Sequence, residues 1–274
     1  MIVPYTYRDT ILKLDNVCVS YDGRPILKNV CAEIRDIYVP GKVTGQIVAF
    51  LGPSGVGKTT LFRNLAGLER PTFGQILLAT QNELAPVKVG QVGVVAQSYP
   101  LFAHRTVLGN LMQPLRQHGD KNAKQVAMEA LRQFEIEDKA HLYPCQLSGG
   151  QKQRVAILQM ILCKERLILM DEPFSGLDLI KLEKACELIQ QAADLDELNT
   201  IIVVTHDVTA AVSIADHIWL LGRDRDTHGD IIPGARIVDT IDLLERGLCY
   251  EKGAITDPKF TETIREIKER FRTL

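Results

Sequence analysis

The chain has 274 residues, of which 46% are apolar and 24% are charged, and its net charge is −2. This composition is ordinary for a soluble globular protein and allows a core of substantial size. The near balance of charge gives no reason to expect nucleic acid as a partner, because proteins that bind the phosphate backbone are usually basic. Six scattered cysteines without a C-x-x-C pair favour a reducing compartment over a disulfide framework or a zinc site.

The sequence also bears on membrane insertion. The N-terminal stretch "MIVPYTYRDTILKLD" lacks a basic segment followed by an apolar core, so it does not predict a signal peptide. The longest apolar runs, such as "LILM" and "IIVV", are far shorter than the roughly 20 residues that span a bilayer. We therefore expect a protein that is soluble by itself, with any membrane role supplied by a partner.

Short β-branched runs alternate with longer amphipathic runs, which is typical of an α/β domain with a mainly parallel sheet. The alternation over Thr10–Tyr21 predicts an edge strand, and Gly45–Gly52 predicts a buried strand followed by a loop and a helix. Val92–Gln97 predicts another buried strand. From Thr106 to about His141, apolar residues recur at three- and four-residue spacing, which predicts a helical subdomain inserted at about 100–150.

The second half of the chain continues the alternation. We expect a long helix to about Glu165 and then, in order, the strand Leu167–Met170, a helix over about Asp178–Asp196, the strand Thr200–Thr205, the helix "DVTAAVSIAD" and the strand "HIWLLG". The stretch "RDRDTHGDIIPGAR" predicts a polar loop. In the tail, one helical face carries apolar side chains and predicts a docked terminal helix, with Phe260, Ile264, Ile267 and Phe271 on that face.

The stretch "GPSGVGKTT" (Gly52–Thr60) has the pattern of a phosphate-binding loop between a strand and a helix. Its glycines allow backbone N–H groups to turn inward around phosphate oxygens, and the helix start adds a positive dipole end. Lys58 adds a point charge for the β- and γ-phosphates, and the Thr59 hydroxyl is a ligand for Mg²⁺. A glycine-rich turn that binds nothing does not account for the strand and helix on either side.

Carboxylates follow the apolar run of "LILMDEP". The carboxyl end of a buried strand is where open α/β sheets bind ligands, so Asp171 is a candidate Mg²⁺ holder. Glu172 is a candidate base that orients the attacking water. Such a pattern alone is often a strand before a solvated turn, but here it lies downstream of a phosphate loop.

Two further polar residues end predicted core strands. His206 follows "TIIVVT" and could donate a hydrogen bond to a γ-phosphate, although a lone histidine is more often structural. Gln97 ends "VGVVAQ" and its amide could reach Mg²⁺ or water, although an isolated glutamine is ordinarily a polar strand end.

A second helix start, "LSGGQ" (Leu147–Gln151), has the serine and glycines of an anion-binding site. Together with the other motifs in this order, it makes the chain resemble an ATP-binding cassette (ABC) ATPase from about Leu12 to Gly222. The resemblance implies a phosphate-loop α/β cassette over 10–245, with a mainly parallel core sheet, an antiparallel β edge and the inserted helical subdomain. It leaves 246–274 as a C-terminal extension with a terminal helix.

The resemblance also implies the roles of individual residues. In the family two cassettes pack head to tail, so Ser148, Gly149 and Gly150 would face the ATP of a second copy. Tyr21 stands where the family stacks an aromatic ring on adenine, and "SGLD" resembles the loop joining the two catalytic edges. Implied as catalytic are Lys58, Glu172 and His206; as Mg²⁺ ligands, Thr59, Gln97 and Asp171; and as ATP-binding, Tyr21, Gly52, Pro53, Ser54, Gly55, Gly57, Lys58, Thr59, Thr60, Gln97, Ser148, Gly149, Gly150, Gln151 and Asp178.

The chain departs from the family pattern in several places. The segment before the phosphate-loop strand is long, which predicts a hairpin extension at about 35–45, and Gln46 stands where the family more often has Glu. After the signature, "AILQMIL" replaces the common "AIARAL" and changes packing without touching the nucleotide contacts.

A compact single cassette resembles the separate-chain ATPase of a bacterial importer. This implies transmembrane permease subunits, a substrate-binding protein and a position at the cytoplasmic, inner face of the cell membrane. The segment "QSYPLFAHRTVLGNLMQPL" resembles the importer region that receives a short helix from the permease. The alternative is a soluble, non-transport ABC protein acting on nucleic acid or protein. The tail resembles nitrate, sulfonate, taurine and bicarbonate importers, but an unrelated regulatory or dimer-stabilising helix, and lipid or amino-acid cargo, remain open.

Overall fold

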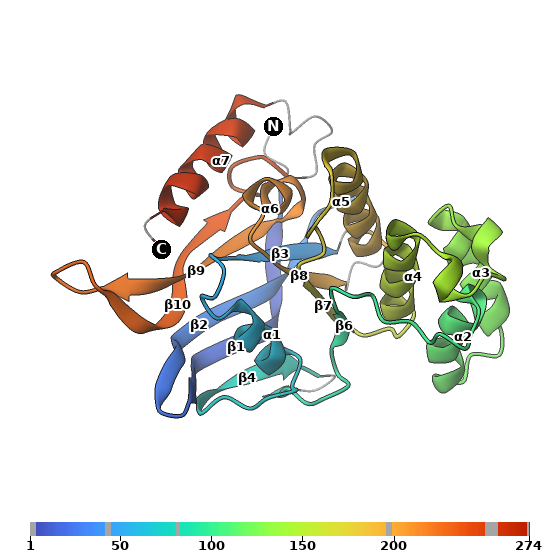
Figure 1. Cartoon of the computed structure of the whole chain (residues 1–274), viewed down its shortest axis with the longest axis horizontal. Helices are drawn as coiled ribbons and strands as arrows, with labels where there is room; N and C mark the ends of the chain where they lie inside the picture. Colours follow the sequence, from blue (N-terminus) through green and yellow to red (C-terminus); the bar gives the residue numbers. More distant parts are fainter. Residues whose placement is uncertain (1–3, 42–44, 81–82, 196–198, 250–256, 273) are drawn as a thin grey trace.

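In the computed structural model, the residues described are 4–41, 45–80, 83–195, 199–249, 257–272 and 274. Their strands form one mixed sheet in the order β5-β4-β1-β2-β10-β9-β3-β8-β7-β6 (Figure 1). One half is parallel and consists of β9 (His217–Arg225), β3 (Gln46–Leu51), β8 (Thr200–Thr205), β7 (Leu167–Asp171) and β6 (Gly93–Val95). The predicted class, an α/β cassette with a mostly parallel sheet, is therefore confirmed.

The other half is largely antiparallel and joins the first through β10, which runs antiparallel to β9 and parallel to β2. Its strands are β10 (Ile231–Asp242), β2 (Arg24–Tyr38), β1 (Thr6–Tyr21), β4 (Phe73–Ala79) and β5 (Leu84–Pro86). The prediction of an edge strand at β1 is wrong, because β1 pairs with β2 on one side and with β4 on the other. Its alternation reflects one solvated face of an antiparallel sheet.

Alternate residues of the buried parallel strands supply two separate cores. In β3, Ala49 and Leu51 face helices on one side of the sheet, whereas Val48 and Phe50 face the opposite side. The first side is covered by α5 (Leu179–Ala193), α6 (Val208–Ile214) and α7 (Pro258–Phe271), and the second by α1 (Lys58–Leu65) and the antiparallel strands (Figure 1). The parallel half of the sheet is therefore covered on both faces, which leaves the ends of its strands as the accessible polar edges.

A group of helices lies to one side of the sheet, in the stretch where the sequence predicts the inserted subdomain (Figure 1). It contains α2 (Val107–Gln117), α3 (Ala123–Gln133) and α4 (Gly149–Ile161), with single 3-10 turns at Glu137–Lys139 and Pro144–Gln146. The Thr106 side chain caps α2 by accepting a hydrogen bond from Gly109 N–H at 3.1 Å. These helices share the core formed with α5 and α6.

Other sequence predictions are corrected or placed by the structure. The predicted strand Val92–Gln97 is shorter, since β6 covers Gly93–Val95, and it lies at the edge of the sheet. The stretch predicted as a polar loop is mostly a hairpin of β9 and β10, with its turn at 226–230. The long segment near 35–45 prolongs β2 to Tyr38 against the start of β1, and residues 42–44 lie outside the described part of the chain. The predicted terminal helix is α7, whose Phe260 and Ile267 are buried.

Candidate active site

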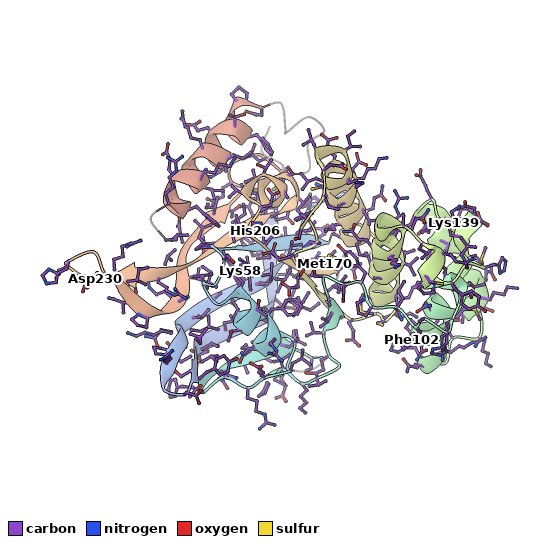
Figure 2. The ribbon with its side chains drawn as sticks, in the orientation of Figure 1. Lys58, Phe102, Lys139, Met170, His206 and Asp230 are labelled. Carbon is purple, nitrogen blue, oxygen red and sulfur yellow. The ribbon has the colours of Figure 1, made fainter. Side chains whose placement is uncertain are left out.

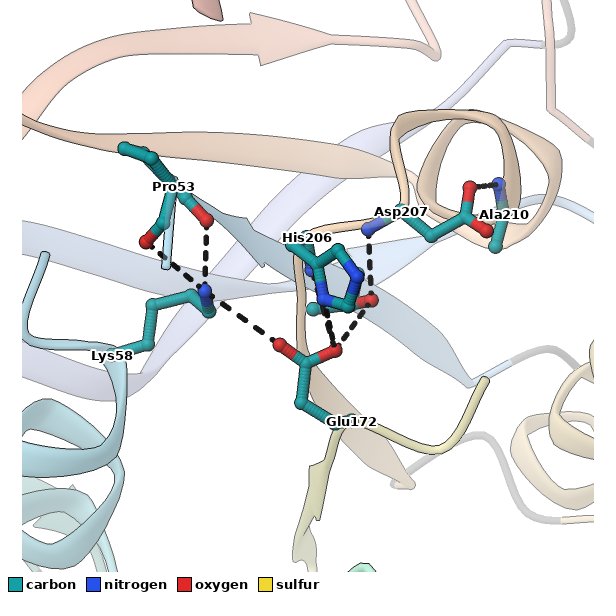
Figure 3. Close-up of polar contacts among 8 residues, drawn as sticks. Pro53, Lys58, Glu172, His206, Asp207 and Ala210 are labelled. Atoms are coloured by element: carbon teal, nitrogen blue, oxygen red, sulfur yellow. Dashed lines mark hydrogen bonds and ion pairs between the residues drawn. The ribbon is translucent and has the colours of Figure 1, made fainter. Parts of the chain in front are cut away.

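The phosphate loop connects β3 to α1 and is held in shape by its glycines. Gly55 and Gly57 have φ of 75° and 119°, in the left-handed region that favours glycine. At Gly52 a Cβ atom would lie 2.8 Å from the carbonyl oxygen of Leu221, so a side chain has no room there. Lys58 Nζ donates to the carbonyl oxygens of Gly52 at 2.8 Å and of Pro53 at 3.3 Å (Figure 3).

Glu172 joins the phosphate loop to the end of β8. Its Oε1 lies 3.6 Å from Lys58 Nζ, and its Oε2 lies 2.9 Å from His206 Nδ1 (Figure 3). The Thr205 hydroxyl donates to the same Oε2 at 3.2 Å. The parallel pairing of Asp171 with Val204 creates this arrangement, because it places the residues after β7 and β8 at one edge. The sequence placed Lys58 in the phosphate loop and Glu172 and His206 after core strands, and the structure brings the three side chains together.

Glu172 is also unusual in its backbone. Its φ of 46° is rare for a residue with a side chain, and such strain persists only where the surroundings fix it. Its N–H donates to the Val204 carbonyl oxygen at 2.8 Å, which holds the strained peptide against β8. The carboxylate is thereby directed at the phosphate loop instead of following the strand.

Charge and burial at this edge suit a divalent cation. Burial raises the pKa of the Asp171 carboxyl, and the neighbouring Glu172 raises it further. Burial lowers the pKa of Lys58, while Glu172 and Asp171 oppose that change. Carboxylate, hydroxyl and amide oxygens are the hard donors that Mg²⁺ prefers, and Asp171, Thr59 and Gln97 are the residues predicted to supply them. Among the described residues, no three or more His, Cys, Asp or Glu side chains gather in a group that could hold a metal ion.

The other residues predicted near the phosphate loop are more exposed than Lys58 and Glu172. Tyr21 is 45% exposed at the end of β1, and its hydroxyl interacts with Glu69 and Thr60 beside α1. The hydrogen bond to the Glu69 carboxylate raises the pKa of Tyr21. Thr59 and Gln97 are exposed, and Gln97 follows β6 at the carboxyl edge of the sheet. Ser54, also exposed, completes the loop.

The second predicted helix start is built differently. Ser148 caps α4 by accepting a hydrogen bond from Gln151 N–H at 3.4 Å, and the Gln151 side chain accepts one from Ser148 N–H at 2.9 Å. The exposed Gly149 and Gly150 have open space where a Cβ atom would be. This reciprocal cap leaves the glycine N–H groups at the helix start directed outward.

A hollow of 630 Å³ lies beside this helix start, between α4 and α5. It is lined by Ser148, Gly149, Gly150 and Gln151 together with Ser175–Leu177 and Lys181, and by no residue of the phosphate loop. Asp178 caps α5 by accepting from Lys181 N–H at 3.0 Å, and its carboxylate forms an ion pair with the same lysine. That pairing lowers the pKa of Asp178. The structure therefore places the signature residues on a face of their own.

Two residues that the sequence did not single out connect these parts. The Tyr99 hydroxyl donates to the Pro173 carbonyl oxygen at 3.1 Å, and Gln153 Nε2 donates to the same oxygen at 3.2 Å. Burial raises the pKa of Tyr99 to about 12, so its hydroxyl remains a donor. Tyr99 thus ties the turn after Glu172 to the loop after Gln97, and Gln153 ties the same turn to α4. The only sequence signal was an aromatic residue two positions beyond Gln97.

A phosphate loop, a carboxylate edge and a separate capped helix start together define a nucleotide-binding cassette of the phosphate-loop class. The ABC transporter family profile matches residues 43–175. This match and the order of the motifs along the chain assign residues 43–175 to the ABC transporter family. The recognition made from the sequence is thus confirmed.

Relatives support the same assignment. The spermidine/putrescine import ATP-binding protein PotA of Haemophilus ducreyi is 39% identical over 219 residues, covering 79% of this chain and 57% of the relative. The putative 2-aminoethylphosphonate import ATP-binding protein PhnT of Salmonella choleraesuis is 39% identical over 213 residues, covering 76% and 55%. The chain thus spans a little over half the length of these relatives.

A solved structure shares the fold. It is described as the dimeric post-hydrolysis state of the ATP-binding cassette MJ0796 bound to ADP and Pi. The two chains are 27% identical with a TM-score of 0.64, over 85% of this chain and 99% of that one. In the described residues, no helix is long and apolar enough to cross a bilayer.

Proposed function

We propose that this chain binds ATP with Mg²⁺ and hydrolyses it as the ATP-binding subunit of an import transporter. The observation that carries the proposal is the convergence of Lys58, Glu172 and His206 at one strand edge (Figure 3). Mg²⁺ would neutralise charge on the phosphates when bound. Thr59, Gln97 and Asp171 supply the oxygen ligands that would hold it.

Each residue of this edge has a proposed role. Lys58 neutralises charge on the β- and γ-phosphates, and the N–H groups of the loop bind phosphate oxygens. Glu172 accepts a proton from the attacking water, and His206 holds the Glu172 carboxylate and donates toward the γ-phosphate. The exposed ring of Tyr21 stacks on adenine.

We further propose that catalysis uses two copies of the chain. The signature face offers N–H groups outward and shares no lining residue with the phosphate loop, so it serves the ATP of a second copy. The dimer described for the similar cassette supports this arrangement. Gly150 and its neighbours would then complete the pocket that the partner's phosphate loop begins.

The importer assignment rests on the relatives and on the stretch after Gln97. Both relatives are import ATP-binding proteins by name, with different cargo, so they support import without identifying the substrate. The stretch 97–115 presents Phe102, which is 41% exposed, near the outer helices (Figure 2). We propose that this surface receives a permease helix at the cytoplasmic face of the membrane, in a complex that includes a substrate-binding protein.

The test is a pull-down of the tagged chain from solubilised membranes, alongside Mg²⁺-dependent ATPase assays of the purified chain. We expect co-purification of a multi-spanning membrane protein. ATPase stimulation by nucleic acid, without any membrane protein in the pull-down, would replace this proposal by a soluble, non-transport ABC protein. Failure of the chain to bind ATP would refute both.

A further inference from the structure

Two leucine residues pack against glycines at the two ends of the phosphate loop. Leu221 of β9 lies against Gly52, where a Cβ atom would come within 3.3 Å of the Leu221 Cβ. Leu27 of β2 lies against Gly57, where a Cβ atom would come within 3.1 Å of Leu27 Cδ2. These contacts fix the two ends of the loop. The middle of the loop, at Ser54 and Gly55, is exposed.

A charged side chain reaches the middle of the loop from β9. Arg223 Nη2 donates to the carbonyl oxygen of Gly55 at 2.7 Å. β9 runs parallel to β3, with Leu220 opposite Leu51, and then continues past the end of β3. The continuation carries Arg223 alongside the loop, which explains how a residue 168 positions away meets Gly55.

Arg223 lies on the β9–β10 hairpin, which is held by strand pairing and by hydrogen bonds at its tip. Arg223 lies opposite Ala235 of β10, and Ala235 in turn pairs with Leu27 of β2. At the hairpin tip, Asp226 accepts hydrogen bonds from the N–H groups of His228 and Asp230 at 2.8 and 2.9 Å. Figure 2 shows Asp230 at the end of this projection, on the side of the molecule away from Lys139. A group held on paired strands is positioned more sharply than one on a free loop.

The neighbouring charges of the hairpin are already engaged. Arg236 forms a forked ion pair with Asp224, with donor to acceptor distances of 2.8 to 3.1 Å. Arg225 Nη1 donates to the carbonyl oxygen of Gly229 at 2.9 Å. Over the described residues, no ion pair joins a carboxylate to Arg223, whose guanidinium donates instead to the Gly55 carbonyl oxygen.

We propose that Arg223 is a positioning residue for the phosphate loop. Its guanidinium fixes the outward carbonyl of Gly55, so that the N–H groups that follow stay directed at the nucleotide phosphates. A charged donor makes this a stronger hydrogen bond than a neutral one, and it polarises the Gly55 peptide. The same guanidinium adds positive charge where the phosphates bind. This role rests on the proposed binding of ATP at the loop.

The test compares Arg223→Met, Arg223→Lys and the matched control Arg225→Met in the full chain. Met keeps most of the aliphatic stem and removes the charged donor. The dissociation constant of Mg-ATP is measured by calorimetry, together with KM, kcat and the melting temperature with and without ATP. Wild-type binding is measured first, because its absence would refute the proposed function itself and not only the role of Arg223.

We expect Arg223→Met to weaken ATP binding and raise KM by roughly tenfold, which is the usual size for losing a charge-assisted hydrogen bond. The value of kcat and the melting temperature without ATP should stay close to those of the wild type, whereas the ATP-induced rise in melting temperature should shrink. Arg223→Lys should restore part of the affinity, and Arg225→Met should bind like the wild type. Equal affinity of Arg223→Met and wild type, or equal losses in Arg223→Met and Arg225→Met, would overturn the proposal.

Discussion

The two helix starts that are proposed to bind phosphate differ in the contacts that the rest of the chain makes with them. At α1, Lys58 and Glu172 are 10% and 18% exposed and contact each other across the strand edge. At α4, Ser148, Gly149 and Gly150 are exposed beside a hollow, and the contacts of Ser148 and Gln151 stay within the cap. A site surrounded by its own residues can bind a ligand alone, whereas outward N–H groups suit the ligand of a second molecule, as we propose for the signature helix start. Substitutions made separately at each helix start therefore test this difference.

The largest effect should come from Lys58→Ala at the completed site. Removing the buried ammonium leaves the loop without its point charge and Glu172 without its cation, so we expect ATP affinity to fall by more than about a hundredfold. Calorimetric titration with Mg-ATP measures it. Lys124→Ala, an exposed lysine of α3, is the control and should bind normally. Retained affinity in Lys58→Ala would mean that the nucleotide site lies elsewhere.

Glu172→Gln should separate binding from hydrolysis. Glutamine keeps the size needed to contact His206 and Thr205 but cannot accept a proton from water, so turnover should fall by about 10²–10⁴ while ATP affinity remains. We expect size exclusion with ATP and Mg²⁺ to show a stable dimer. A variant that stays monomeric under these conditions would contradict the role of Glu172 as the base.

A mixture of two inactive variants tests whether the signature helix start at Ser148 serves the ATP of a second copy. Lys58→Ala damages the phosphate loop, and Ser148→Arg places a bulky cation at the signature helix start. In a mixed dimer both lesions fall in one composite pocket and the other pocket is intact, so an equal mixture should regain roughly a quarter of wild-type ATPase activity. Each variant alone is the control. A mixture as inactive as its components would count against pockets shared between copies.

The candidate residues of the strand edge could be picked out from the sequence because phosphate chemistry constrains residue types at fixed spacing. A φ of 119° at Gly57 favours glycine, and the short apolar runs before Glu172 and His206 are typical of buried parallel strands. Parallel neighbours end at one edge, so these side chains could be placed together without a structure. The predicted convergence therefore follows from local pattern and one rule of topology.

Contacts between distant segments could not be predicted in this way. Arg223 reaches Gly55 only because β9 extends beyond β3, and the polar, glycine-containing sequence of the hairpin resembles a loop. Tyr99 and Gln153 meet at the Pro173 carbonyl from separate elements. Likewise, alternation in β1 showed that one face is solvated but not which strands lie beside it.

The smallest expected effect concerns α7, which packs on α6, the helix that follows His206. Substitutions that weaken the attachment of α7 test whether the residues around Glu172 and His206 depend on it. Arg246 donates to both oxygens of Glu266, at 2.6 and 3.3 Å, and both side chains are about one third exposed. Such a pair contributes about 0.5–1 kcal/mol, so a cycle of Arg246→Ala, Glu266→Gln and the double variant should show a coupling of that size in urea unfolding at neutral pH. The ATP affinity of all three should match the wild type.

Acid should remove this coupling. The hydrogen bond from Arg246 lowers the pKa of Glu266 below its ordinary value. A carboxyl whose pKa is lower in the folded state adds stability that is fully present above its unfolded pKa and is lost as pH falls through the folded pKa. The coupling should therefore be intact at pH 7 and absent once the pH is below that lowered value. A coupling unchanged in acid would assign the contact to packing of the Arg246 stem, and a loss of ATP affinity would show that α7 supports the catalytic edge as well as the fold.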